Sequence, residues 1–133
     1  MKRQLINPPH TRALYDQLHF SQAVRVGDLI WVSGQVGIDP DTLRPAVGMA
    51  AQARLAFDGV RNVLEAAGAG LADTVELTTF HIDLRGAGIA EFTQVKDECF
   101  PDRYPAWTAV GVTQLARPEL LVEVRAVAMA GSG

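Results

Sequence analysis

The apolar residues between Gly48 and Ala67 recur at steps of three and four, which is the spacing of one face of a helix. Polar residues fall between them, so the segment predicts an amphipathic helix of about five turns. Gly68 and Gly70 follow it and supply the residue type that ends helices in a left-handed conformation. Such a helix must bury its apolar face against another layer of secondary structure. The apolar positions are Met49, Ala53, Ala56, Phe57, Val60, Val63, Leu64 and Ala67.

The rest of the chain predicts strands before and after this helix, together with one shorter helix. Runs rich in Val, Ile, Thr and Phe indicate the strands, and Gly, Pro and Asp separate them. The elements alternate less regularly than parallel β-α-β repeats do, so we expect an α+β fold with two helices packed on one face of a mixed sheet. The expected elements are a strand at Lys2–Ile6, two strands within Gln22–Val36 around the Gly27-Asp28 turn, the helix Gly48–Ala67, a strand at Thr74–Ile82, a helix at about Gly88 to Cys99, and strands at Trp107–Leu115 and Leu120–Met129.

Length and composition predict one globular domain over residues 1–133. Hydrophobic residues make up 48% and charged residues 20% of the chain, which excludes a disordered protein. The 12 basic and 15 acidic residues give a formal charge of −3, which disfavours nucleic acid as a partner. Residues 1–9 lack the apolar segment of a signal peptide, and no apolar run approaches the roughly 18 residues that cross a bilayer. We therefore expect a cytoplasmic protein with no membrane partner.

Motifs for metals and common cofactors are absent from the sequence. Cys99 is the single cysteine, and the three histidines lack the spacing of paired metal ligands. Neither the phosphate loop G-x-x-x-x-G-K nor the dinucleotide motif G-x-G-x-x-G occurs. Ser33 does not lie in the G-x-S-x-G turn that exposes a nucleophilic serine. The sequence thus predicts neither a metal ion nor an organic cofactor.

Glu123 is an unusual residue because it stands in the middle of a strongly apolar strand. Alternate side chains of a strand share a face, so Glu123 and Arg125 lie on one side of it. A carboxylate in such a place is costly to bury unless it is paired or used. The alternatives are an ion pair with Arg125, a solvent-facing edge, or a functional site. On the preceding strand, the small residues Ala109 and Gly111 share a face with Trp107 and indicate a concavity or a close-packed contact.

Several stretches, in this order and spacing, resemble the reactive intermediate deaminase family, Rid/YjgF. The resemblance covers nearly the whole chain from about residue 18 onward, and the closing strand is its clearest part. It implies a chorismate-mutase-like α+β fold, a homotrimer, and a small-molecule cleft at each subunit interface. The stretches are Phe20–Val24, Ile30–Gln35, Gln52 in the long helix, Tyr104–Val110 and Leu121–Ala128.

The resemblance also implies a chemistry, which depends on a Pro-Ala-Arg motif. Family members with the full site hydrolyse 2-imino acids and their enamine tautomers to 2-oxo acids and ammonia, without a metal or an organic cofactor. The motif arginine holds the substrate carboxylate as a bidentate partner. In this chain the motif reads Pro105-Ala106-Trp107, so the arginine is replaced.

Other site positions of the family are partly retained. Phe20 stands where active members carry a tyrosine, so the hydroxyl group is lost, and Ala109 occupies a small-residue or cysteine position. The resemblance assigns polar and backbone contacts to Ser33 and Gly34. It assigns the positioning of the attacking water to Glu123. The catalytic candidate is therefore Glu123, and the substrate-binding candidates include Phe20, Ser33, Gly34, Trp107 and Ala109.

Two functions from different classes follow from these substitutions. The first is a cofactor-independent deaminase-like hydrolase of imines or enamines with weak or altered activity on 2-imino acids, in which Arg103 or Arg125 replaces the motif arginine. The second is a trimer that binds a small molecule or regulates without catalysis. Trp107 itself favours neutral aromatic or cationic ligands that lie on the indole and pair with Glu123, or else it plugs the pocket.

Overall fold

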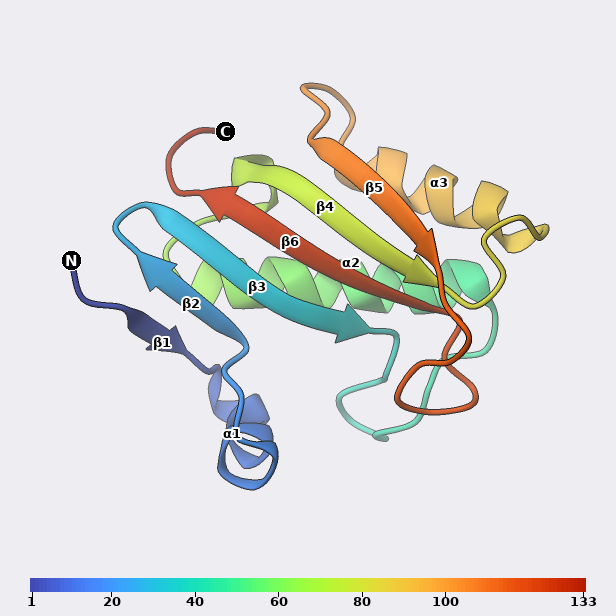
Figure 1. Cartoon of the computed structure of the whole chain (residues 1–133), viewed down its shortest axis with the longest axis horizontal. Coiled ribbons are helices and arrows are strands. Elements are labelled where there is room, and N and C mark those ends of the chain that lie inside the picture. Colours follow the sequence, from blue (N-terminus) through green and yellow to red (C-terminus); the bar gives the residue numbers. More distant parts are fainter.

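The computed structural model describes residues 1–133 and contains a six-stranded sheet in the strand order β1-β2-β3-β6-β4-β5 (Figure 1). Neighbouring strands are antiparallel except for β4 and β5, which are parallel. Parallel neighbours need a crossover connection, and α3 supplies it. The expected α+β fold with a mixed sheet is confirmed. The strands are β1 Gln4–Ile6, β2 Ala23–Val26, β3 Leu29–Val36, β4 Thr74–His81, β5 Ala106–Gly111 and β6 Val122–Met129, and the helices are α1 Arg12–Leu18, α2 Met49–Ala66 and α3 Gly88–Cys99.

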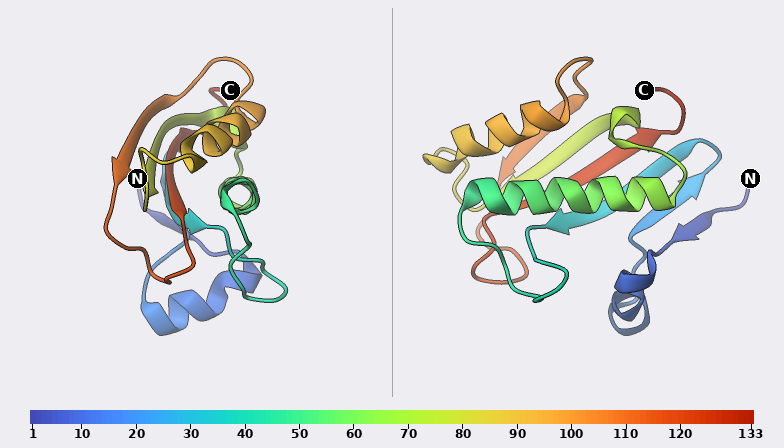
Figure 2. Two further views of the ribbon diagram at one scale, coloured as in Figure 1. Left: turned by 90° about the vertical axis from the view of Figure 1, so that its right-hand side faces the viewer. Right: turned by 180° about the vertical axis from the view of Figure 1, so that it is seen from behind.

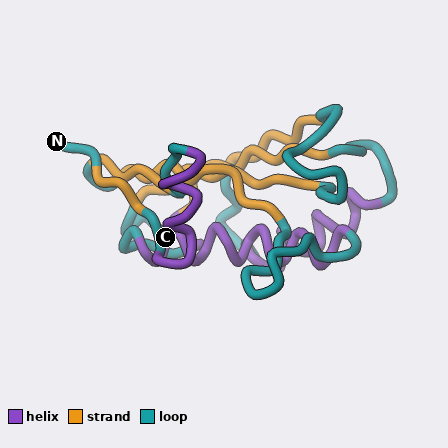
Figure 3. The backbone as a smooth tube through the Cα atoms, turned by 90° about the horizontal axis from the view of Figure 1, so that it is seen from below, coloured by secondary structure: helices purple, strands orange, loops and turns teal.

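The two predicted helices, α2 and α3, lie on the same side of the sheet, as the end-on view in Figure 2 shows. Seen from below, the strands form one layer with α2 running along its underside (Figure 3). Phe57 of α2 packs against Phe92 of α3 and against Phe100, with ring centroids 5.7 and 5.9 Å apart. A continuous apolar core therefore fills the space between the sheet and the helices. None of the helices combines the length and the apolar character that a membrane span needs.

The structure differs from the sequence prediction at α1 and at β5. α1 was not predicted because it has only seven residues and none of them is buried. It projects from one corner of the molecule below β2 (Figure 1). The predicted strand Trp107–Leu115 ends at Gly111 instead, because its only neighbour β4 ends at His81, the residue that pairs with Gly111. Helix α2 and strands β4 and β6 agree with their predicted positions to within a few residues.

Gln52 fastens two loops to the buried side of α2. Its side chain is 1% exposed, and its amide nitrogen donates to the carbonyl oxygens of Ala46 and Glu119, both at 2.9 Å. Its amide oxygen accepts from the backbone N–H of Leu121 at 2.8 Å. Three backbone groups thus depend on one buried side chain, which holds the segment before β6 in place.

We expect Gln52→Met to lower the free energy of unfolding by roughly 2–4 kcal/mol, because the methionine fills the space but makes none of the three hydrogen bonds. Chemical denaturation at a fixed protein concentration measures this difference. Gln94→Met on the exposed side of α3 is the matched control, and its effect should stay within about 0.5 kcal/mol. Equal stability of the two variants would show that Gln52 does not fasten these loops.

Candidate functional site

Glu123 lies on the face of the sheet opposite α2 and α3, which we call the open face. Along β6 the side chains of Val122, Val124, Ala126 and Ala128 are buried toward the helices, and the alternate ones point the other way. The Glu123 carboxyl group makes no hydrogen bond and no ion pair within the chain, so the alternative of a salt bridge with Arg125 is not realised. Burial raises the pKa of the Glu123 carboxyl group above its ordinary value. The group is thus half-buried, unpartnered and more basic than an exposed glutamate.

Gly34 makes room for the Glu123 carboxyl group. The pairing of β3 with β6 shifts between Val32 and Gln35, and Gly34 lies within this irregularity. A Cβ atom at position 34 would lie 2.9 Å from Cγ of Glu123 and would collide with its carboxyl oxygen Oε1. Glycine is needed here for space, because any side chain would displace the carboxyl group.

Ser33 is held in place by hydrogen bonds to the segment that leads into β2. The Ser33 hydroxyl donates to the carbonyl oxygen of Ser21 at 2.7 Å, and the Ser33 N–H donates to that of Gln22 at 2.8 Å. Phe20 immediately precedes Ser21 and is 38% exposed. The structure therefore gathers Ser33, Gly34 and Glu123 at one bulged position of the sheet, with Phe20 at the adjoining chain segment.

Trp107 lies on the other face of the sheet, toward the helices. It pairs with Leu77 across the β4–β5 ladder, and its ring centroid is 6.1 Å from that of Phe92 on α3. Ala109 pairs with the buried Thr79 and faces the same way. Trp107 and Glu123 of one chain therefore point to opposite sides of the sheet. A single ligand can therefore touch Trp107 and Glu123 only if Trp107 comes from one chain and Glu123 from another.

A chain of hydrogen bonds fixes the orientation of the Trp107 indole. Its Nε1–H donates to the hydroxyl oxygen of Thr79 at 2.9 Å, and this hydroxyl lies 2.7 Å from Nε2 of His81. Since an indole only donates, the Thr79 hydroxyl hydrogen is free to point to His81, whose Nε2 then accepts. Burial lowers the pKa of His81, which favours the neutral ring that this arrangement requires. The Trp107 indole is thus held in one orientation, although 37% of the residue is exposed.

Neither predicted substitute for the motif arginine reaches Trp107 within the chain. Arg103 donates to the carbonyl oxygen of Ser132 at 3.1 Å, near the C-terminus. Arg125 shares the open face with Glu123, where it pairs with Thr78 across the β4–β6 ladder. Arg125 therefore lies on the opposite side of the sheet from Trp107.

The cation that lies at Trp107 is Lys96, a residue that the sequence did not single out. Its Nζ is 4.7 Å from the centroid of the indole ring and 3.2 Å from a carboxyl oxygen of Asp97. The signal was its spacing, because Lys96 stands four residues after the buried Phe92 and continues the same helix face. Lys96 already occupies a cation position over the indole ring. The expectation that Trp107 favours a neutral aromatic or cationic ligand stays a prediction.

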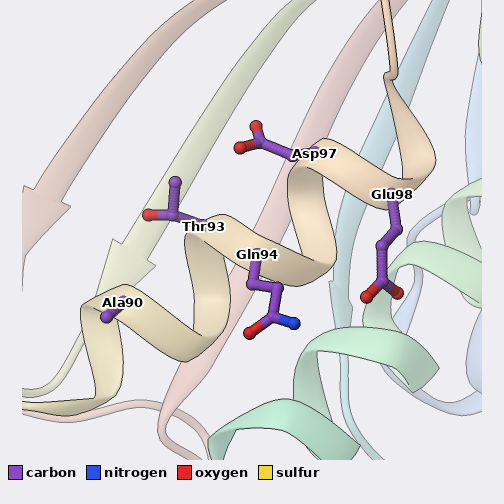
Figure 4. A pocket seen from close by; sticks show the side chains of 5 residues that line it. All are labelled: Ala90, Thr93, Gln94, Asp97 and Glu98. Atoms are coloured by element: carbon purple, nitrogen blue, oxygen red, sulfur yellow. The ribbon is translucent and has the colours of Figure 1, made fainter.

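Two shallow depressions on the surface do not coincide with these residues. One of about 700 Å³ runs along the outer side of α3 and is drawn in Figure 4, where Glu98 extends toward α2 while Thr93 and Asp97 point the other way. The other, of about 400 Å³, lies at the ends of β4 and β5. No group of three or more His, Cys, Asp or Glu side chains is arranged to hold a metal ion.

We expect Glu123→Gln to be more stable than the wild type at pH 7 and to lose this advantage below about pH 4. A carboxyl group whose pKa is raised by folding binds more protons in the native state, so the stability of the wild type falls as the pH rises past the group's ordinary value of 4.5. Chemical denaturation at both pH values measures the difference. Glu65→Gln, at an exposed position of α2, serves as the control. An advantage that does not change with pH would contradict the burial of the Glu123 charge.

Comparisons with known proteins agree with this architecture. The family model described as Endoribonuclease L-PSP matches residues 10–130. The RutC family protein YjgH of Escherichia coli is 39% identical over 125 residues, covering 93% of this chain and 94% of the relative. The 2-iminobutanoate/2-iminopropanoate deaminase of Escherichia coli is 32% identical, covering 83% and 86%. The crystal structure of Rv2704 from Mycobacterium tuberculosis, described as a member of the YjgF/YER057c/UK114 family, superimposes with a TM-score of 0.83 at 30% identity, covering 97% of this chain and 100% of that one. The chain therefore belongs to the Rid/YjgF family.

Proposed function

We propose that this protein is a single-domain cytoplasmic homotrimer that hydrolyses reactive imine or enamine metabolites in clefts between its subunits, without a metal or an organic cofactor. The observation that carries the proposal is the unpartnered, half-buried carboxyl group of Glu123, which lies against Gly34 on the open face. A deaminase of the same family, 32% identical to this chain, supports the reaction type. The excess of acidic residues argues against the ribonuclease activity that the family description names.

The open face supports the trimer because it exposes large apolar side chains that no helix covers. Trp31 is 39% exposed, and the paired residues Leu29 and Met129 are 37% and 42% exposed. Exposed apolar surface of this kind marks an interaction site. We propose that a second chain packs on this face with its own β5 edge toward Glu123. A cleft between two chains is also the arrangement in which Trp107 and Glu123 meet the same ligand.

In the proposed reaction Glu123 moves both protons of the attacking water to the substrate nitrogen, one at a time. Its carboxylate accepts the first proton as the water oxygen adds to the C=N carbon of the substrate, and it passes this proton to the nitrogen, which gives a neutral carbinolamine. Glu123 then accepts the proton of the carbinolamine hydroxyl group and donates it to the nitrogen as the C–N bond breaks, so that ammonia leaves and a carbonyl product remains. Because burial raises the pKa of Glu123, its carboxylate is a stronger base than an exposed glutamate.

The proposed activity on simple 2-imino acids is weak. A bidentate arginine makes two charge-assisted hydrogen bonds of about 1.5–3 kcal/mol each to a substrate carboxylate, and Trp107 makes none. The loss corresponds to roughly two to four factors of ten in rate. Phe20 also lacks the hydroxyl group of the family's tyrosine. The alternative function, a trimer that binds a small molecule without turnover, is favoured by the same two substitutions.

Light scattering coupled to gel filtration should report a mass about three times 14.3 kDa for the protein at micromolar concentration. The reason is the apolar open face, whose exposed side chains need a covering chain. Trp31→Glu places a charge in this contact and should yield a smaller species, whereas Arg12→Glu on α1 should not. A monomeric wild type would remove the cleft and with it the proposed function.

Ammonia release from freshly generated 2-iminopropanoate should be slow in this protein and absent in Glu123→Gln. We expect a rate at least about 100-fold below that of relatives with the motif arginine, and Trp107→Arg should raise it. A coupled assay for ammonia, with Glu65→Gln as control, measures all of these rates. Turnover that survives in Glu123→Gln would contradict the assigned role. No turnover of any imine, combined with tight binding of a metabolite, would establish the non-catalytic alternative.

A further inference from the structure

Lys96 is the only charged residue among those that the fold buries. The residue is 7% exposed, whereas the other buried polar residues are glutamines, threonines and His81, whose pKa burial lowers. Burying an ammonium group is costly unless the group is paired or used. Lys96 belongs to α3, which packs beside the edge strand β5, and its ammonium group lies over the ring of Trp107 from that strand.

The partners of Lys96 within the chain leave its charge incompletely compensated. Its one ion pair is with the neighbouring residue Asp97, whose side chain is 61% exposed, and carboxylates so exposed give only weak attraction. The indole of Trp107 attracts the charge through its ring face but carries no negative charge itself. An ammonium group has three N–H donors, and Asp97 accepts from only one of them. Lys96 therefore keeps capacity for a further anionic partner.

The Trp107 indole provides an apolar surface of fixed orientation beside the Lys96 ammonium group. The hydrogen bond from its Nε1–H to Thr79 prevents the ring from turning, while 37% of the residue stays exposed at the sheet edge. A ligand with an apolar body can lie on the exposed part of the indole and bring a negatively charged end to Lys96. A cationic ligand in the same position meets the ammonium group and is repelled.

We propose that Lys96 is the residue through which this protein binds the anionic end of its ligand, so that small carboxylates with an apolar body bind better than the matching amides or amines. This inference rests on the proposed cleft, of which Trp107 forms one wall. Lys96 offers a single point of charge, where the family's motif arginine would hold a carboxylate with two parallel bonds. The activity on carboxylate substrates is accordingly lower than that of relatives with the motif arginine. It depends on Lys96 of α3 rather than on the residue at position 107 of β5.

The test uses phenylacetate, phenylacetamide and phenethylamine, three probes of similar shape with negative, neutral and positive ends. Calorimetric titration of the intact wild-type protein should show phenylacetate as the tightest ligand. Lys96→Met keeps the length of the side chain and should weaken phenylacetate by roughly 10- to 100-fold while leaving phenylacetamide nearly unchanged. Lys96→Arg should retain the preference. Arg54→Gln removes an exposed cation of α2 that pairs loosely with Glu98 and should change nothing.

Several outcomes would overturn the inference. If Lys96→Met binds phenylacetate as tightly as the wild type does, Lys96 only packs on the indole. If Lys96→Met fails to fold, the NMR signals of the Lys96 side chain in the wild type decide, and they must shift when phenylacetate is added. If the wild type binds phenylacetamide or phenethylamine best, the cleft exists and only the role of Lys96 is wrong. If none of the probes binds and no imine is turned over, the proposed function fails as well.

Discussion

The alternation of side chains along β6 is the constraint on which the rest of the structure depends. β6 lies inside the sheet between β3 and β4, and its four buried residues pack under α2. Since successive side chains of a strand point to opposite faces, burying Val122 and Val124 forces Glu123 between them onto the open face. The cost of an unpaired carboxyl group there is tolerated because the apolar contacts on the other side hold the strand in register. Stability of the core and exposure of the candidate base are thus two consequences of one pattern.

The two faces of the sheet divide the candidate site into two halves. Glu123 and Gly34 belong to the open face, whereas Trp107 and Lys96 belong to the edge between β5 and α3. β5 is an edge strand, so its helix-side residues remain accessible at the border of the molecule. A second chain laid on the open face is the simplest way to join the halves. The proposed chemistry, with a base on one half and a cation on the other, then requires the assembly.

Most of the fold could be predicted from the residues alone. The helix from Met49 to Ala66 and the strand from Val122 to Met129 follow from strong local periodicity, which survives in any packing. The helix from Arg12 to Leu18 was missed because it buries no residue, and an element without a buried face leaves no periodic signal. The end of β5 was misplaced because it depends on where its neighbour β4 stops, which is a fact about another part of the chain.

The sequence by itself determined the family, the layered α+β architecture and the loss of the motif arginine at position 107. It also determined that Glu123 and Arg125 share a strand face. Only the tertiary structure decided that Trp107 and Glu123 lie on opposite sides of the sheet and that Lys96 rests on the indole. The physical reason is that periodicity assigns side chains to faces within one element, whereas the partner of a face depends on how distant elements pack. Lys96 and Trp107 are 11 positions apart in the chain, and the turn between α3 and β5 brings them together.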